Sequence, residues 1–299
     1  MIIPEVESTK APYLIHEDLK RKIIQYYNEA GSDYGAWSRK FNMHFGFGSI
    51  WNIFNREKML ERMNEEVFKR LAITKHTGHI ADLGCGVGAT MRYGARNFNH
   101  VRFTGLTIVP WQIEKGKALN KFDSLHNPVN FKLEDYHAST LPSNQFNGVY
   151  AIESACYSPS SLRRRFVSEI YRVLDSGGRF VIVDGFRKKQ EQNLPPLVSK
   201  IYKGICSNWA LPGMMNIHEL KKQLIDAGFR NVRSENISWK VAPSILHVPV
   251  VILKFILKKK FSGEELSQQS LNNLRGSFEA LLLGLFQQYF GYYIVSGEK

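Results

Sequence analysis

The sequence has little cysteine. Its 299 residues include three, Cys85, Cys156 and Cys206, which stand far apart and form no C-x-x-C pair. An odd number without that spacing argues against a disulfide framework and against a cysteine-based zinc site. We therefore predict no metal site, and we expect a reducing compartment, the cytoplasm, as the location.

Signals for export and for membrane crossing are also missing. The first residues show no basic segment followed by an apolar core, so no signal peptide is expected. No apolar run reaches the roughly 18 residues that a membrane span needs. The sequence also lacks internal repeats and low-complexity tracts, so we expect an ordinary globular chain.

The composition supplies a core and an excess of positive charge. Hydrophobic residues make up 43% of the chain, and the formal net charge is +13. The hydrophobic content argues against global disorder. The positive net charge favours anionic partners, such as nucleic acid, anionic lipid surfaces or phosphorylated substrates. The alternative is that scattered lysines serve solubility alone.

Short apolar segments alternate with helical patterns after residue 78. This alternation predicts βαβ units and an α/β fold with a mostly parallel sheet. The predicted strands are 79–83, 101–106, 129–133, 147–152 and 178–184, with late edge strands over 232–241, and the predicted helices are 14–30, 55–73, 110–121, 161–174 and 217–227.

The most informative segment runs from His79 to Gly88 and reads HIADLGCGVG. An apolar strand passes into a turn with alternating glycines, and Asp82 stands at the junction. Glycine permits a sharp turn and the close approach of a ligand, and α/β folds hold nucleotides where a strand passes into a helix. A dinucleotide fingerprint has the spacing G-x-G-x-x-G. Here the order is D-x-G-x-G-x-G, and no P-loop lysine follows.

This pattern resembles the first motif of the class I S-adenosylmethionine-dependent methyltransferases. The resemblance implies a Rossmann-like, seven-stranded, mostly parallel sheet with helices on both faces, and S-adenosyl-L-methionine as the cofactor. In that family the acid and the glycines surround the methionine part of the cofactor. The corresponding residues here are Asp82, Gly84, Gly86 and Gly88.

Two further strand ends carry motifs of the family. The segment GLTIVPWQ at 105–112 is similar to G-[IVL]-T-[IL]-S-x-x-Q of cyclopropane fatty acid synthases, which implies that Thr107 and Gln112 lie near the ribose. KLEDY ends the third predicted strand, and the resemblance places Asp135 at the adenine amino group and Tyr136 beside the ring. For Asp135 the alternative is a turn-forming aspartate.

The fourth predicted strand ends in YAIESACY at 150–157, which resembles a segment of sterol C-methyltransferases. Glu153 stands where open α/β sheets hold ligands, so it is a candidate to orient an acceptor, accept a proton or stabilise a carbocation. The alternative is a structural acid held by backbone donors. Tyr157 is a second catalytic candidate. The segment EIYRVLDSGG at 169–178 resembles a further family motif, E-x-x-R-V-L-x-P-G-G, which is structural.

Ahead of the sheet, YYN at 26–28 and NMHFGF at 42–47 look like lid regions of sterol and tocopherol methyltransferases. The resemblance makes Tyr26, Trp37 and His44 candidates for cofactor or substrate contact; we assign Tyr26 and Trp37 to the cofactor and a catalytic role to His44. A role in the core is the alternative for each. The aromatic, glycine-punctuated stretch 34–48 is predicted to cover a pocket.

We expect one folded unit with three regions: a helical lid at 1–75, a cofactor-binding core at 76–240, and a cap at 241–299 whose end returns to the sheet or packs on the cap. The segment 241–261 is apolar, contains two prolines and ends in lysines. It either covers an apolar pocket from inside the protein or lies on a membrane with its lysines at the headgroups.

Together these features predict a methyltransferase of a lipidic or isoprenoid small molecule, sterol-like or a prenyl diphosphate, that acts by C-methylation through a carbocation. The expected partner is an apolar or amphiphilic acceptor and not nucleic acid, because no N/D-P-P-[YF] motif follows the fourth predicted strand. The alternatives are an O- or N-methyltransferase of an aromatic secondary metabolite, a cyclopropane synthase, an RNA methyltransferase and a non-catalytic lipid-surface protein. A homo-oligomer is left open.

Overall fold

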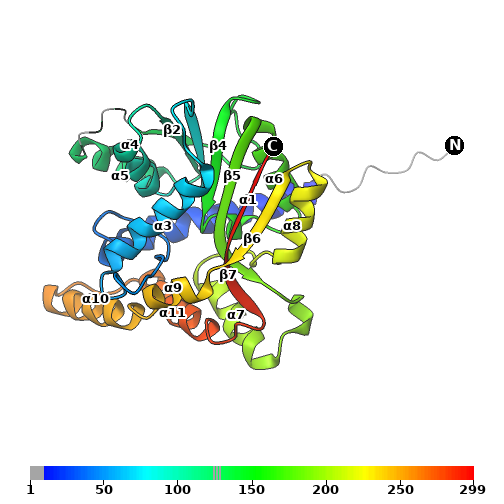
Figure 1. Cartoon of the computed structure of the whole chain (residues 1–299). Coiled ribbons are helices and arrows are strands. Elements are labelled where there is room, and N and C mark those ends of the chain that lie inside the picture. The colour runs from blue at the N-terminus through cyan, green and yellow to red at the C-terminus, as the bar shows by residue number, and fades with distance from the viewer. Residues whose placement is uncertain (1–9, 124, 126, 128) are drawn as a thin grey trace.

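Seven strands form one sheet (Figure 1) in the computed structural model, which describes residues 10–299 except 124, 126 and 128. β1 to β5 run parallel, whereas β7 is antiparallel to both of its neighbours. The predicted α/β fold is confirmed, and the five strands predicted from the alternation overlap β1 to β5. The sheet order is β3 (Asn130–Leu133), β2 (Arg102–Thr107), β1 (His79–Leu83), β4 (Phe146–Ile152), β5 (Leu174–Arg187), β7 (Phe290–Glu298) and β6 (Arg230–Asn236).

Helices pack on both faces of the sheet, because successive strand residues point to opposite sides. Ile80 and Val181 join the core beneath α3 and α4, whereas Ala81 and Phe180 join the core beneath α6 and α8. The helices of the first face are α3 (Arg56–Leu71), α4 (Ala89–Asn97) and α5 (Pro110–Phe122), and those of the second are α6 (Arg163–Val173) and α8 (Ile217–Asp226).

Helices from both ends of the chain gather at the carboxyl ends of the parallel strands, where Figure 1 shows α7, α9, α10 and α11 as a layer. Open α/β sheets bind ligands at this edge, so these helices enclose the site. Their bounds are α1 (Lys10–Ala30), α2 (Tyr34–Trp37), α7 (Pro196–Asn208), α9 (Ser238–Ile245), α10 (Val248–Ser262) and α11 (Gln268–Leu283), and single 3-10 turns lie at Gly31–Asp33, Ala155–Tyr157 and Glu191–Asn193.

Two parts of the C-terminal region differ from the sequence-based expectation. Strand structure was expected over 232–241, but β6 ends at Asn236 and α9 begins at Ser238. The stretch Ser238–Ser262, which contains α9 and α10, is long and apolar enough to cross a membrane by length and composition alone, and in the described part of the chain no other helix meets that test. Of its most apolar window, 22% is buried inside the protein. The last residues return to the sheet as β7, one of the two predicted alternatives. The expected boundaries at 75 and 240 stay predictions.

Candidate active site

The glycine turn after β1 adopts a backbone that glycine favours. Gly84, Gly86 and Gly88 have φ values of +87°, +52° and +78°, in the left-handed region where a Cβ is costly. A Cβ at Gly84 would lie 2.4 Å from Cβ of Ser154, and one at Gly88 would lie 2.6 Å from the Phe131 ring. A Cβ at Gly86 would meet only the Met43 sulfur, at 3.1 Å. Gly84 and Gly88 therefore allow close packing, and Gly86 keeps space open beside the turn.

One cavity lies against this turn, and we call it the turn cavity. Its wall comes from the carboxyl ends of β1, β2 and β3 and from the start of α5, as the resemblance implied. Burial raises the pKa of Asp82 to about 8. The Thr107 hydroxyl donates to Oε1 of Gln112, and it accepts a 3.1 Å hydrogen bond from the backbone N–H of Val109. The predicted cofactor residues that line the turn cavity are Asp82, Gly84, Gly86, Thr107, Gln112, Asp135 and Tyr136.

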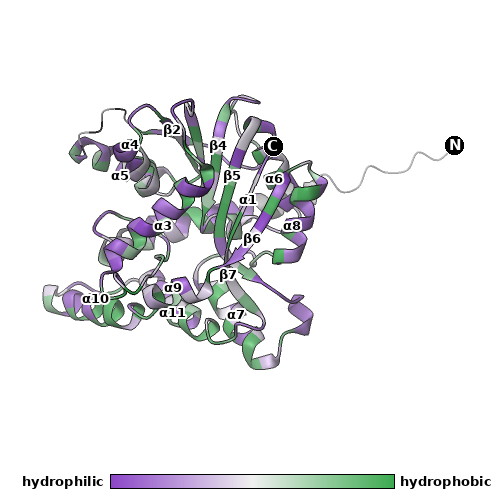
Figure 2. Cartoon of the chain, viewed as in Figure 1, coloured by the Kyte–Doolittle hydropathy of each residue, from purple (hydrophilic) through white to green (hydrophobic). Residues whose placement is uncertain are grey.

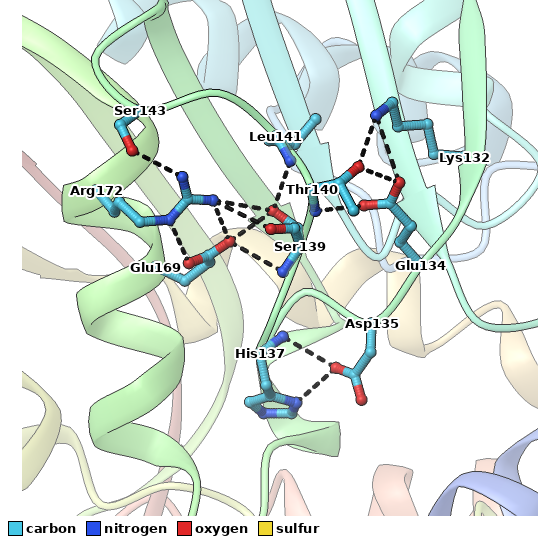
Figure 3. A network of polar contacts seen from close by, with 10 residues as sticks. All are labelled: Lys132, Glu134, Asp135, His137, Ser139, Thr140, Leu141, Ser143, Glu169 and Arg172. Carbon is cyan, nitrogen blue, oxygen red and sulfur yellow. Dashed lines mark hydrogen bonds and ion pairs between the residues drawn. The ribbon is translucent and has the colours of Figure 1, made fainter.

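Hydrogen bonds fix the segment after β3 in place (Figure 3). Oδ1 of Asp135 accepts from the backbone N–H of His137 at 2.9 Å and lies 2.8 Å from Nδ1 of the same residue. The Tyr136 hydroxyl donates to the carbonyl of Ser154 at 2.8 Å. These contacts anchor Asp135 and Tyr136 on the wall of the turn cavity.

The E-x-x-R motif supports the same segment from α6. Oε1 of Glu169 accepts from the backbone N–H of Ser139 at 3.1 Å, and Nη2 of Arg172 donates to that oxygen at 2.7 Å (Figure 3). Nη1 of Arg172 also donates to the Ser143 hydroxyl at 2.9 Å. The motif thus ties the loop between β3 and β4 to α6, which agrees with the structural role that its sequence predicted.

A second cavity, which we call the apolar cavity, lies between the sheet edge and the C-terminal helices. Its volume is about 230 Å³, against about 100 Å³ for the turn cavity. Figure 2 shows hydrophobic residues interspersed with hydrophilic ones on α7, α10 and α11, and the residues of these helices that line the cavity are mostly apolar. No lysine or arginine is among its described lining residues, and its acids are Asp33, Glu153 and Asp184. Among the described residues, no group of three His, Cys, Asp or Glu side chains is placed to hold a metal ion.

The two cavities share part of one wall. The shared residues come from three separate parts of the chain, and they include all three predicted catalytic candidates. The two cavities therefore adjoin at these side chains. The shared residues are Tyr27, Met43, His44, Glu153 and Tyr157.

Glu153 occupies a strained position at this junction. Its φ is +46°, which a non-glycine residue seldom adopts and which is often associated with functional sites. Oε1 accepts a 2.6 Å hydrogen bond from the backbone N–H of Phe45 and a second one from the Tyr292 hydroxyl. Burial raises the pKa of Glu153 to about 8, so the ligand-free side chain is largely protonated at neutral pH.

His44 is held on both sides by protein groups. Nδ1 lies 2.9 Å from the carbonyl of Phe45, and Nε2 lies 3.0 Å from Oδ1 of Asn64. Burial lowers the pKa of the ring, and a neutral imidazole carries a single N–H donor. A general base must present a nitrogen to its substrate, so these contacts do not support the predicted catalytic role. They fit a ring that holds the aromatic loop over the site.

Tyr157 belongs to a group of tyrosines at the junction. Its hydroxyl lies 3.1 Å from that of Tyr27 and donates to the carbonyl of Trp209 at 3.2 Å. Tyr27 also packs edge-on against Tyr26, with ring centroids 4.9 Å apart. The arrangement places aromatic rings around the point where the cavities meet, and the catalytic role of Tyr157 stays a prediction.

Three predicted contacts lie elsewhere. Tyr26 lines neither cavity and bonds Oδ1 of Asn273 at 2.9 Å, while its neighbour Tyr27 lines both. Trp37 lines the apolar cavity and not the turn cavity. Gly88 packs against Phe131, as described above, and is not part of the turn cavity wall. Trp37 therefore lies on the side where substrate contact is possible, and the predicted cofactor contacts of Tyr26, Trp37 and Gly88 stay predictions.

Sequence reasoning missed two polar residues of the apolar cavity. Asp184, near the end of β5, accepts backbone hydrogen bonds from Cys156 at 2.9 Å and Gly185 at 2.8 Å, and burial raises its pKa to about 7. An acid at the end of a buried strand was the signal used for Glu153, and it applied here too. Tyr292 lies on β7, and nothing in the sequence pointed to it.

The sequence comparisons agree with this geometry. A family profile described as a methyltransferase domain matches residues 80–178. A probable chloroplastic tocopherol O-methyltransferase from Oryza sativa subsp. japonica is 30% identical over 237 residues, which is 75% of this chain and 64% of the relative. A cycloartenol-C-24-methyltransferase from Arabidopsis thaliana is 35% identical over 160 residues, or 53% of this chain and 45% of the relative. The chain thus matches about two thirds or less of the length of these relatives.

Among solved structures, the geranyl diphosphate C-methyltransferase from Streptomyces coelicolor A3(2), in complex with Mg²⁺, geranyl-S-thiolodiphosphate and S-adenosyl-L-homocysteine, aligns with a TM-score of 0.72. The alignment covers 99% of each chain at 14% identity, and this likeness shows the fold. Residues 80–178 thus carry a methyltransferase domain, and the sheet order and the glycine turn agree with the class I S-adenosylmethionine-dependent fold that the motifs resemble.

Proposed function

We propose that the chain binds S-adenosyl-L-methionine in the turn cavity and methylates an uncharged lipidic or isoprenoid acceptor in the apolar cavity. The observation that carries this proposal is the shared wall, which brings the two cavities together at Tyr27, Met43, His44, Glu153 and Tyr157. Methyl transfer depends on alignment of donor and acceptor in a site that excludes water. Two adjoining cavities, of which the second has a mostly apolar lining, meet that requirement.

The turn cavity fits the cofactor. The space beside Gly86 would be narrowed by any Cβ, with Met43 as its nearest neighbour at 3.1 Å. Asp82 is a buried acid on the same wall, and the positive charges of the cofactor would favour its carboxylate form. When bound, S-adenosylmethionine supplies an electrophilic methyl group on a sulfonium. Asp82, Thr107, Gln112 and Asp135 would hold and orient it.

The apolar cavity favours an uncharged acceptor over a prenyl diphosphate. A diphosphate needs cationic side chains or a metal ion as partners. The described wall offers neither and carries Asp33, Glu153 and Asp184 instead. A sterol-like or prenylated phenolic molecule has no anionic group that these acids would repel. Of the two acceptor classes that the sequence suggested, the neutral one is therefore proposed.

The residues at the junction suit C-methylation through a carbocation. Methyl addition to an alkene leaves a cation on the acceptor, which the faces of aromatic rings stabilise. The rings of Tyr27, Tyr157 and Trp37 lie on the cavity wall. A positive charge nearby favours the carboxylate of Glu153, which can then accept the proton whose loss ends the reaction. The Phe45 N–H and the Tyr292 hydroxyl both donate to Oε1 of Glu153, and neither donates to Oε2.

A second candidate is an O-methyltransferase of a prenylated phenol. The same carboxylate could accept the proton of a phenol hydroxyl as its oxygen attacks the methyl group. The junction position of Glu153 favours either acceptor atom equally. The atom that is methylated therefore separates these two candidates.

The proposal is tested by methyl transfer with radiolabelled S-adenosylmethionine. Acceptors are offered in separate pools of sterols, prenylated phenols, prenyl diphosphates, simple phenolic metabolites and RNA. We expect label in the sterol or prenylated phenol pool, and mass spectrometry of the product distinguishes carbon from oxygen. Gly86→Leu is the matched inactive control. Label in prenyl diphosphates alone would contradict the argument from charge, and label in RNA alone would overturn the proposal.

A further inference from the structure

The outer side of α9 and α10 is apolar although it faces solvent. Leu246, Val250, Leu253, Leu257 and Phe261 are 66%, 52%, 58%, 42% and 85% exposed. They are spaced by three or four residues, which places them along one side of a helix. A stripe of this length is more than the scattered exposed leucines of an ordinary surface.

The loop between α2 and α3 extends this stripe. Trp51 and Phe54 are 89% and 91% exposed. The backbone N–H of Gly48 donates to the carbonyl of Lys240 at 2.6 Å, and Nε2 of His247 lies 2.8 Å from the carbonyl of Ile53. The loop is therefore joined to α9 and to the start of α10. We call the combined patch the outer apolar surface, and it consists of Ile50, Trp51, Phe54, Trp239, Leu246, Val250, Leu253, Leu257 and Phe261.

Positive charge lies next to the outer apolar surface. Lys240, Lys254, Lys258 and Lys260 are exposed on α9 and α10, and Ser238–Ser262 contains no acidic residue. Lys254 and Lys258 directly follow Leu253 and Leu257 and are one helical turn apart, so they lie beside the apolar stripe. An apolar stripe with lysines beside it is the pattern of a helix that lies on an anionic membrane surface.

The inner side of the same helices belongs to the acceptor site. Val241, Val248, Val251 and Phe255 line the apolar cavity. The backbone N–H of Gly46 also donates to the buried Ser244 hydroxyl at 2.8 Å, which ties α9 to the loop over the site. The helices that form one wall of the apolar cavity therefore also carry the outer apolar surface on their other side. Because its inner side is packed in the protein, the helix pair fits a surface-bound segment better than a membrane span.

We propose that the outer apolar surface docks the protein on an anionic phospholipid bilayer, with α10 lying in the headgroup region. Docking of this kind does not depend on the activity proposed above. A consequence does rest on it: an acceptor dissolved in the bilayer would reach the apolar cavity past α9 and α10 without crossing water.

Vesicle sedimentation tests the docking. The full chain is mixed with vesicles of phosphatidylcholine alone or of equal amounts of phosphatidylcholine and phosphatidylserine. We expect the wild type to bind the anionic vesicles on the order of ten-fold more tightly. Trp51→Ser/Phe54→Ser/Leu253→Ser should lose binding to both kinds of vesicle. Lys254→Glu/Lys258→Glu should lose the preference for phosphatidylserine, as should the wild type at high salt.

The controls lie on α5, away from this surface. Phe122→Ser removes an equally exposed ring, 84% exposed, and Lys117→Glu reverses an exposed lysine. Both should bind vesicles like the wild type. Circular dichroism and thermal unfolding check that every variant is folded.

Three results would overturn the proposal. The first is equal vesicle binding by the wild type and the triple variant. The second is a wild-type dimer in analytical ultracentrifugation that the triple variant abolishes, together with no vesicle binding, because a second copy would then cover the surface. The third is resistance of the cellular protein to alkaline carbonate extraction, which would indicate a membrane span.

An activity measurement separates this proposal from the proposed function. With an acceptor in detergent micelles the triple variant should match the wild type, and with the same acceptor in anionic vesicles it should be on the order of ten-fold slower. If no acceptor is methylated in either form, the proposed function fails, while sedimentation still decides the docking.

Discussion

Replacing Glu153 by glutamine separates a chemical role from a structural one. The Glu153→Gln side chain has the same shape and keeps an acceptor oxygen for the backbone N–H of Phe45 and the Tyr292 hydroxyl. It loses the carboxylate that would accept a proton. General acid–base groups typically contribute about 10²- to 10⁴-fold to a rate, which corresponds to roughly 3–5 kcal/mol of barrier at about 1.4 kcal/mol per factor of ten. We expect turnover to fall by that factor.

The binding of cofactor should change much less than turnover. Glu153 is one residue of the shared wall, whereas the turn cavity is built mainly from the ends of β1, β2 and β3. Turnover is measured with radiolabelled methyl groups at saturating cofactor, and affinity is measured by calorimetry. Glu153→Leu is the structural control, because it leaves the Phe45 N–H without its acceptor and should cost about 1–3 kcal/mol of stability. Wild-type turnover in Glu153→Gln would make the residue structural and refute this reasoning.

Three further predictions address the same site. Gly86→Leu should abolish cofactor binding in calorimetry, because the leucine side chain fills the space beside the turn. Gly86→Ala adds mainly the strain of a left-handed backbone, about 1–2 kcal/mol. Unchanged cofactor affinity in both variants would exclude the turn cavity as the cofactor site. Tyr292→Phe removes a hydrogen bond that lowers the pKa of Glu153, so the rise of kcat/KM with pH near 8 should move to higher pH, and an unmoved profile would contradict Glu153 as the base. The pKa of Asp82 is raised from 3.8 to about 8 in the ligand-free fold. The contribution of this side chain to the free energy of unfolding is therefore complete below pH 4 and is lost as pH rises to 8. Thermal unfolding should show a smaller loss of Tm across that range for Asp82→Asn than for the wild type.

Residues next to the ends of parallel strands could be predicted from the sequence. The alternation of apolar strands and helices located β1 to β5, and parallel strands bring their carboxyl ends to one edge. Asp82, Thr107, Asp135 and Glu153 each follow or end such a strand, so their place in the chain already determines their place in the site. The motifs identified them, and the sheet order brought them together.

Two kinds of residue were harder to predict: those whose position depends on which side of a helix they occupy, and those brought to the site by strands far apart in the sequence. Successive residues on a helix point about 100° apart, so the choice of Tyr26 in place of Tyr27 was enough to select a side chain that faces α11. Tyr292 reaches Glu153 because β7 pairs antiparallel with β5, a contact between segments more than 100 residues apart along the chain. Neither hydrophobic period nor motif spacing carries that information.

The charge distribution separates two explanations of the net charge that the sequence alone left open. A chain with a formal net charge of +13 was expected to attract anions, and an anionic substrate was one explanation. The described wall of the apolar cavity has acids and no lysine or arginine, so the interior favours cations, such as a sulfonium or a carbocation. The lysines of α9 and α10 lie instead on the outside of that wall. If the proposed docking holds, these lysines serve an anionic membrane surface and not the proposed acceptor.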